Sequence, residues 1–136
     1  VEVVSWAKKI EELGAGEIVI TSVDREGTGL GYDINLIQKV SSVVSIPVVA
    51  CGGGGKPEHV AHAINDGGAD AIALASMLHY DYIAKNAMKG DFSNEGNIEF
   101  LKKRSSFAKI NPNSISSIKK EMIRAGIPTR CTRMEE

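Results

Sequence analysis

The sequence predicts an α/β protein in which parallel strands are joined by helical crossovers. Short apolar runs rich in β-branched residues begin near residues 17, 46 and 70, and segments with helical periodicity lie between them. Glycine-rich loops follow the strands. Alternation of this kind is typical of a parallel sheet. The chain has 136 residues, of which 43% are hydrophobic and 24% charged, so it is long enough for one globular domain.

The first half alternates regularly between helix and strand. The predicted elements are a helix over 2–13, a strand over 17–22, a helix over 33–44, a strand over 46–51, a helix from Pro57 that stops at Gly67, and a strand over 70–76. Gly14 supplies the usual helix stop, and Asp33 is a good N-cap. Pro47 and Pro57 stand at the start of a strand and of a helix, where a missing N–H is tolerated.

After Ser76 the regular alternation is lost. Short helices are predicted over 81–89 and 97–104, capped by Asp81 and Asn97, within a polar, basic insertion over 81–113. Ser114 caps a final helix within 114–126, whose apolar residues recur at steps of three and four. We therefore expect one domain over 1–136, with a solvated helical insertion before its last helix.

The run Gly52–Gly55 lies between a strand and a helix, which is where backbone N–H groups can approach an anion. It matches neither a Walker loop nor a dinucleotide fingerprint, because Pro57 follows Lys56. Ala75 and Ser76 end the next strand, and barrel enzymes often build a phosphate site from two such neighbouring loops. The pattern favours phosphate binding over a mere tight turn.

Other polar residues fall at the same predicted edge. The segment 21–28 is dense in hydrogen-bonding side chains, and Asp24 either accepts hydrogen bonds from a ligand or pairs with Arg25. Cys51 ends a strand without an identifiable base, so packing or substrate lining is favoured over nucleophilic catalysis. His59 and His62 lack a third ligand at useful spacing, and we expect no metal and no cofactor.

Four motifs together resemble the cyclase subunit of imidazole glycerol phosphate synthase. They are Thr21–Thr28, Gly31-Tyr32-Asp33, Ala50–Gly55 and Ala75–Tyr80. The resemblance is nearly continuous over residues 1–80 and resumes weakly over 115–130. It implies a partial (β/α)₈ (TIM) barrel, made of the last three βα units with a preceding helix and a helical insertion after the last strand.

The same resemblance implies a lyase of histidine biosynthesis that uses ammonia from a glutaminase subunit on a bis-phosphorylated ribotide. Gly52, Gly53 and Ser76, with Ala75 beside them, are then the phosphate-binding residues. Thr21, Asp24, Gly27 and Thr28 line the substrate, with Cys51 at the end of the next strand. Glu17 resembles a charged residue of the ammonia gate, and Arg130 resembles a basic residue near the glutaminase interface.

No residue of this chain matches the two catalytic aspartates of that family. We therefore expect the chain alone to be inactive, and to associate with itself or with the missing barrel half so as to cover its open sheet edges. Two alternatives stay open. In the first, the chain is a cyclase-like paralogue that delivers ammonia in sugar amidation, because Cys51 and the insertion are closer to such paralogues. In the second, the chain is a phosphate-binding half-barrel without catalysis.

Composition limits the other partners. The formal charge is −1, from 16 basic and 17 acidic residues, which argues against nucleic-acid binding. No apolar run is long enough to span a membrane. Two cysteines and no apparent secretory signal predict a reduced, cytoplasmic protein.

Overall fold

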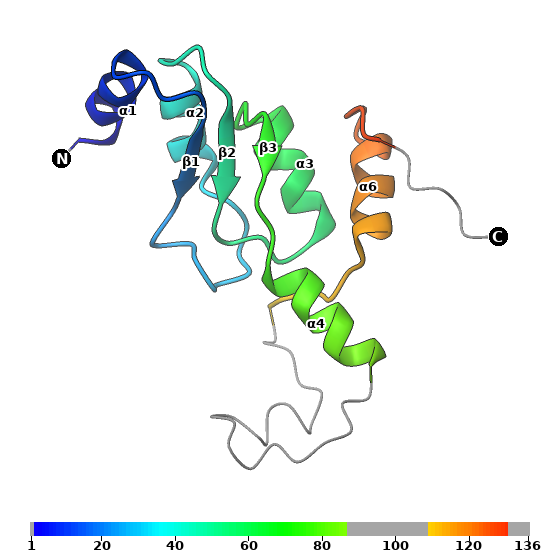
Figure 1. Cartoon of the computed structure of the whole chain (residues 1–136). Coiled ribbons are helices and arrows are strands. Elements are labelled where there is room, and N and C mark those ends of the chain that lie inside the picture. Colours follow the sequence, from blue (N-terminus) through cyan, green and yellow to red (C-terminus); the bar gives the residue numbers. More distant parts are fainter. Residues whose placement is uncertain (1, 87–108, 131–136) are drawn as a thin grey trace.

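A computed structural model describes residues 2–86 and 109–130 and shows a parallel sheet flanked by helices (Figure 1). The helices are α1 (Val3–Glu12), α2 (Ile34–Ser41), α3 (Pro57–Asn65), α4 (Ser76–Lys85) and α6 (Ile115–Arg124). The strands are β1 (Ile18–Thr21), β2 (Val48–Cys51) and β3 (Ala71–Ile72). The predicted order of helices and strands is confirmed from α1 through β3.

The three strands form one sheet in the order β1-β2-β3, and both pairings are parallel. Ile18 lies opposite Val48, and Thr21 lies opposite Cys51. All three strands therefore end at the same edge, which we call the carboxyl edge. Helical crossovers connect them, as the spacing of the apolar runs predicts.

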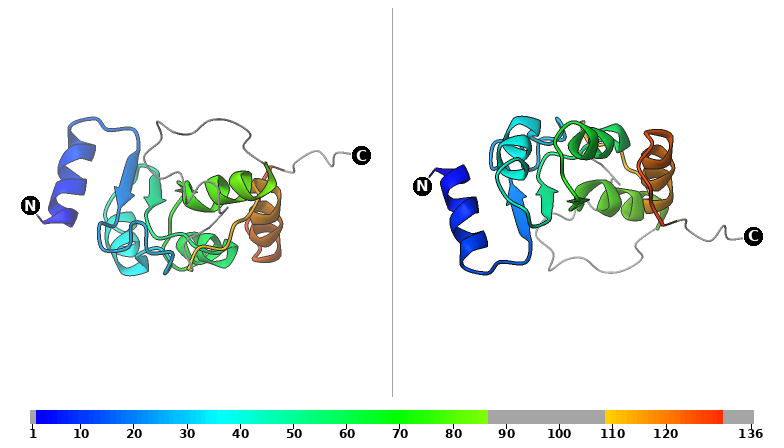
Figure 2. Two further views of the ribbon diagram at one scale, coloured as in Figure 1. Left: turned by 90° about the horizontal axis from the view of Figure 1, so that it is seen from below. Right: turned by 90° about the horizontal axis from the view of Figure 1, so that it is seen from above.

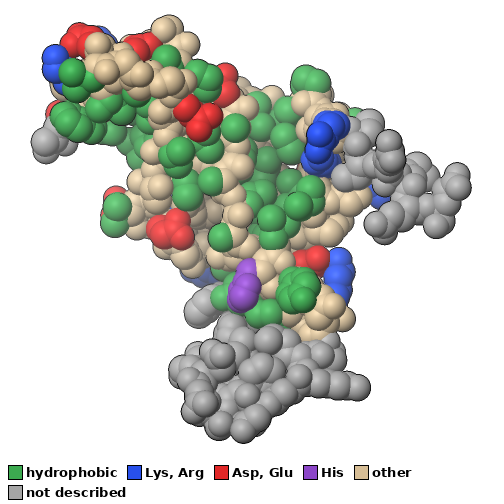
Figure 3. Space-filling view, in the orientation of Figure 1, with side chains coloured by type: hydrophobic (Ala, Val, Ile, Leu, Met, Phe, Trp, Pro, Cys, Tyr) green, Lys and Arg blue, Asp and Glu red, His purple; other side chains and the backbone are tan. Residues whose placement is uncertain are grey.

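One face of the sheet is covered and the other is open. Ile18, Ile20, Val48 and Ala50 are buried in a core with residues of α2 and α3. Both views of Figure 2 place α2 and α3 on the same side of the sheet, with α1 and α6 at opposite ends. On the other face Val19 is 60% exposed, and Figure 3 shows hydrophobic side chains gathered there. A sheet with one apolar open face is the geometry of a partial barrel.

Two of the predicted helix caps, Asp33 and Ser114, are confirmed. The Asp33 carboxylate accepts a hydrogen bond from the Leu36 N–H at 3.0 Å, so α2 begins where the sequence predicts. The Ser114 hydroxyl accepts one from the Ser117 N–H at 3.2 Å and starts α6. Pro57 is the first residue of α3.

The prediction of a helix beginning at Asp81 is wrong. The helix α4 begins at Ser76, and Asp81 lies inside it, where its carboxylate pairs with the Lys85 ammonium at 2.7 Å. The third strand is also shorter than predicted, because only Ala71 and Ile72 pair with β2. The chain leaves the sheet soon after Ile72 and turns into α4. The predicted helix over 97–104 lies outside the described residues.

Candidate functional site

A cavity of about 140 Å³ opens at the carboxyl edge, where the ends of β2 and β3 meet two loops. Its lining includes all four residues predicted to bind phosphate, namely Gly52, Gly53, Ala75 and Ser76. They come from the loop after β2 and from the start of α4. The fold therefore brings together two groups that are more than 20 residues apart in the sequence.

Glycine is required in the first of these loops because another loop packs against its backbone. Gly53 has φ +99°, and its carbonyl accepts a hydrogen bond from the Gly31 N–H at 2.8 Å. A Cβ atom at Gly53 would collide with the Gly31 carbonyl. A Cβ at Gly54 would lie 2.6 Å from the Tyr32 hydroxyl. Close loop packing therefore explains why side chains are absent from this wall of the cavity.

The second group is the N-terminus of a ten-residue helix. Ala75 is the N-cap of α4, and no side chain caps this end. Backbone N–H groups in a first turn lack intrahelical acceptors, and the helix dipole places partial positive charge there. Ser76, the first residue of α4, adds a hydroxyl to the cavity wall. Such a combination of loop and helix end is suited to an anion.

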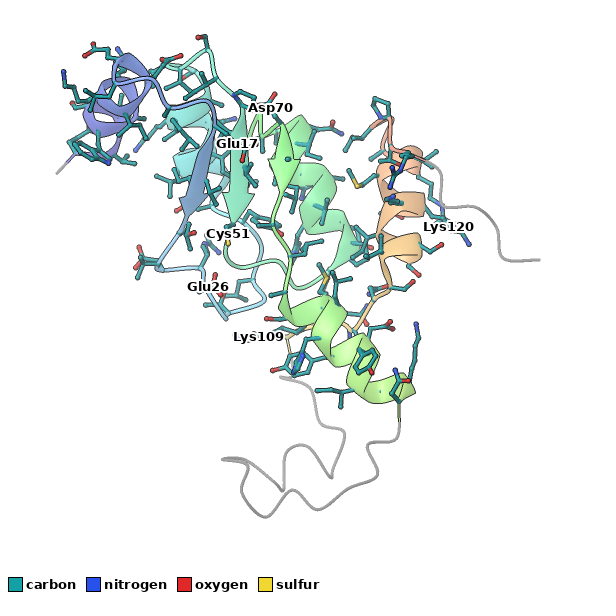
Figure 4. The ribbon with its side chains drawn as sticks, in the orientation of Figure 1. Glu17, Glu26, Cys51, Asp70, Lys109 and Lys120 are labelled. Carbon is teal, nitrogen blue, oxygen red and sulfur yellow. The ribbon has the colours of Figure 1, made fainter. Side chains whose placement is uncertain are left out.

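Glu26 and Cys51 lie beside each other at the cavity. Figure 4 shows Glu26 and Cys51 near one another at the carboxyl edge, and both line the cavity. A Glu26 carboxylate oxygen would lie 3.0 Å from a Cβ atom at Gly52. Glu26 therefore borders the anion-suited wall and can accept hydrogen bonds from a ligand's hydroxyl or amine groups.

Tyr32 forms part of the cavity wall and is almost fully buried. Its hydroxyl donates a hydrogen bond to the Ala73 carbonyl at 3.1 Å. Burial, followed by the neighbouring Cys51 and Glu26, raises the pKa of the phenol. Tyr32 therefore stays protonated and serves as a fixed donor that ties the loop before α2 to the chain beyond β3.

The residues predicted to line the substrate divide into two sets. Gly27 and Cys51 line the cavity, whereas Thr21, Asp24 and Thr28 do not. Thr21 is exposed at the end of β1, and Asp24 is exposed in the loop that follows. The Thr28 hydroxyl donates to the Arg25 carbonyl at 2.7 Å and accepts from the Leu30 N–H at 3.2 Å, so it shapes this loop.

Glu17 and Arg130 lie away from the cavity. Glu17 is exposed just before β1, and Figure 4 shows it with Asp70 at the opposite edge from Cys51. Arg130 is exposed near the C-terminal end of the described chain, where its carbonyl accepts a hydrogen bond from Lys119.

Sequence reasoning missed one side of the cavity. Ile110 is buried and lines it, although it falls in the predicted solvated insertion. The Asn111 N–H donates to the Gly55 carbonyl at 2.8 Å, and the Asn113 N–H donates to the Met77 carbonyl at 3.2 Å. The returning end of the insertion therefore packs against both groups of the site. The sequence offers only a weak signal for this, because Ile110 is one of several apolar residues scattered through the polar segment 81–113.

Within residues 2–86 and 109–130, no three His, Cys, Asp or Glu side chains gather as metal ligands would. In the same part of the chain, no helix has the length and apolarity needed to cross a bilayer.

A parallel sheet with an open face, a glycine loop after one strand and a helix N-terminus after the next define a partial (β/α)₈ barrel with an anion-suited site at its carboxyl edge. The model of the histidine biosynthesis protein family matches residues 1–84, and the chain belongs to that family.

Its relatives include proteins named imidazole glycerol phosphate synthase subunit HisF. The one from Methanocaldococcus jannaschii is 54% identical over 80 residues, which are 59% of this chain and 29% of the relative. The one from Desulforapulum autotrophicum is 46% identical over 95 residues, which are 70% of this chain and 37% of the relative. The one from Methanosarcina mazei is 44% identical over 104 residues, which are 76% of this chain and 35% of the relative. The chain thus spans about a third of the length of these curated relatives.

A solved structure supports the fold independently. The chain superposes with a TM-score of 0.52 on a chain in the crystal structure of the Amycolatopsis orientalis BexX/CysO complex. The match covers 95% of this chain and 44% of the other at 17% identity, so it bears on the fold alone.

Proposed function

We propose that this chain is the phosphate-binding, C-terminal part of a cyclase subunit of imidazole glycerol phosphate synthase. The whole protein then acts as a lyase of histidine biosynthesis, converting a bis-phosphorylated ribotide with ammonia from a glutaminase subunit. The family membership and the HisF relatives support the assignment. Cytoplasmic location follows from the same assignment.

One observation carries the binding part of this proposal. The cavity is walled by Gly52 and Gly53 on one side and by Ala75 and Ser76 on the other. Backbone N–H groups of the loop and of the first turn of α4 donate to the phosphate oxygens, and the Ser76 hydroxyl adds a donor. Because these donors are fixed by the backbone, little ordering is needed when the anion binds.

The rest of the substrate extends from the phosphate across the carboxyl edge. Cys51 and Gly27 contact it at the cavity wall, and Thr21 and Asp24 contact it further along the same edge. Thr28 acts through the shape of its loop. Ammonia enters from the opposite edge, where Glu17 is part of the gate and the glutaminase binds. Arg130 contributes to the glutaminase surface.

Turnover requires residues that this chain does not supply, because none of its residues matches the catalytic aspartates of the family. In the described chain, β1 and β3 each pair on one side only, and Val19 is 60% exposed on the open face. We propose that the remaining barrel strands, or a second copy of the chain, cover these surfaces. Light scattering during size-exclusion chromatography tests this, and a clean monomer contradicts it.

A second candidate is a cyclase-like paralogue that delivers ammonia in sugar amidation. It is favoured by Cys51 in the cavity wall and by the returning end of the insertion, which packs on the glycine loop. A third is a phosphate-binding half-barrel without catalysis. Incubation with the ribotide and an ammonium salt separates the main proposal from the other two. The main proposal predicts turnover only with the missing barrel half, whereas the second and the third predict none even then. Turnover by the chain alone contradicts both the main proposal and the third.

Isothermal titration with inorganic phosphate tests the site itself. Ala75→Asp places a carboxylate at the N-cap of α4, where it suits the helix but repels an anion. We expect the wild type to bind and the variant to lose at least about tenfold in affinity. Ala84→Asp, at an exposed position of the same helix, is the matched control and should bind like the wild type. Equal affinity in all three proteins contradicts the proposed site.

A further inference from the structure

His59 contacts two loops that meet at the site, the glycine loop after β2 and the loop before α2. Its Nδ1 accepts a hydrogen bond from the Gly55 N–H at 3.2 Å, immediately after the cavity-lining glycines. Its ring also lies against the neighbouring loop, because a Cβ atom at Gly31 would be 3.5 Å from the His59 Cγ. His59 therefore contacts both loops while lining neither wall of the cavity.

The Gly55 bond fixes the state of the imidazole. Since the Gly55 N–H is the donor, Nδ1 must be an unprotonated acceptor, and the proton of the neutral ring is on Nε2. Protonation of Nδ1 would set two N–H groups against each other and break the bond. Burial, followed by the charge of Lys56, lowers the pKa of His59 and favours the neutral ring.

The ring also borders a groove of about 610 Å³ that carries positive charge. Lys56 and Lys109 line this groove together with His59. The loop before α2 contributes only the uncharged residues Gly29 and Leu30. On its own helix, Glu58 favours protonation of the ring, whereas Lys56 and His62 oppose it. Protons can thus reach the ring from solvent, although most neighbouring charges oppose protonation.

We propose that His59 is a positioning residue, whose unprotonated ring holds the glycine loop in its anion-binding shape through the Gly55 N–H, so that protonation of His59 weakens anion binding. This inference rests on the proposed phosphate site. It makes an unusual prediction, because protonation adds a positive charge near the site. Simple electrostatics predicts that affinity for an anion rises as the pH falls, whereas loss of loop positioning predicts that it declines.

Sulfate is the appropriate probe, because its charge is constant where histidine titrates. We expect the affinity of the wild type for sulfate to fall about three- to tenfold from about pH 8 to about pH 5, which corresponds to the loss of one hydrogen bond. His59→Asn retains an acceptor that does not titrate, so its affinity should be close to that of the wild type at the higher pH and should not fall. His62→Asn, the same change at an exposed position of the same helix, should behave like the wild type.

Three outcomes are decisive. A wild-type affinity that is constant or rises on acidification, with His59→Asn unchanged, overturns the role of His59 and leaves the phosphate site standing. Absence of sulfate binding at every pH overturns the phosphate site and this inference with it. If the wild type weakens and His59→Asn does not, the role is supported. The Gly55 amide resonance, which should shift with the His59 titration in the wild type and in His62→Asn but not in His59→Asn, checks the contact without any ligand.

Discussion

The two edges of the sheet are held together in different ways. At the carboxyl edge, glycine loops contact each other through backbone atoms, as between Gly31 and Gly53. At the opposite edge, carboxylates hold the loops. Asp70 accepts from the Val48 N–H at 2.9 Å, and Glu11 accepts from the Ser45 N–H at 2.8 Å. The edge at which we propose an anion site is thus stabilised mainly by backbone contacts, whereas the opposite edge also uses carboxylates.

The largest loss of stability is expected at Gly55, where an added side chain would meet backbone atoms of two other segments. A Cβ atom at Gly55 would lie 2.7 Å from the Lys109 carbonyl oxygen and would also collide with Gly29. Neither neighbour is a flexible side chain, so Gly55→Ala should lower the free energy of unfolding by about 3 kcal/mol. Urea denaturation measures this loss.

Gly16 provides the matched control at the other edge, because a Cβ there would meet nothing within 4 Å. Gly16→Ala should change the stability by less than about 0.5 kcal/mol, or raise it slightly. Similar losses in the two variants would show that the carboxyl-edge loops do not pack as described.

A smaller effect is expected at Asp70. Asp70→Ala leaves the N–H of Val48, a fully buried residue, without its acceptor and should cost about 1 to 2 kcal/mol of stability. Asp70→Asn retains an acceptor oxygen and should recover most of this loss. Thermal unfolding of both variants checks the prediction, which fails if Asp70→Asn is as unstable as Asp70→Ala.

The smallest effect concerns pH. The Ser45 hydroxyl, followed by the Ser45 N–H, lowers the pKa of Glu11 below its ordinary value of 4.5. Because the folded pKa is the lower one, this stabilisation is present above pH 4.5 and is lost as the pH falls through the folded value. As the pH is lowered below 4.5, the free energy of unfolding of Glu11→Gln, measured by urea denaturation, should therefore fall less than that of the wild type. Identical pH profiles would contradict the contact.

Much of this molecule could be predicted from local sequence signals. Apolar periodicity and caps such as Asp33 predicted the helices and strands up to β3, and the glycine run placed Gly52 and Gly53 after a strand. Parallel topology then required Ala75 and Ser76 to lie near them, and both line the same cavity.

What escaped prediction depends on contacts between distant segments. The early start of α4 at Ser76 has no N-cap side chain to signal it. Ile110 and Tyr32 reach the cavity only because residues 109–113 and the loop before α2 pack against the glycine loop. Likewise, nothing in the sequence spacing distinguishes His59, which holds Gly55, from the exposed His62.

The most direct test of the account compares the two edges during a phosphate titration followed by amide resonances. Binding at the carboxyl edge predicts saturable shifts at Gly52, Gly53 and Ser76, with little change at Ser45 and Asp70. Shifts spread evenly over both edges, or confined to the edge that carries Asp70, would contradict an anion site between the glycine loop and α4.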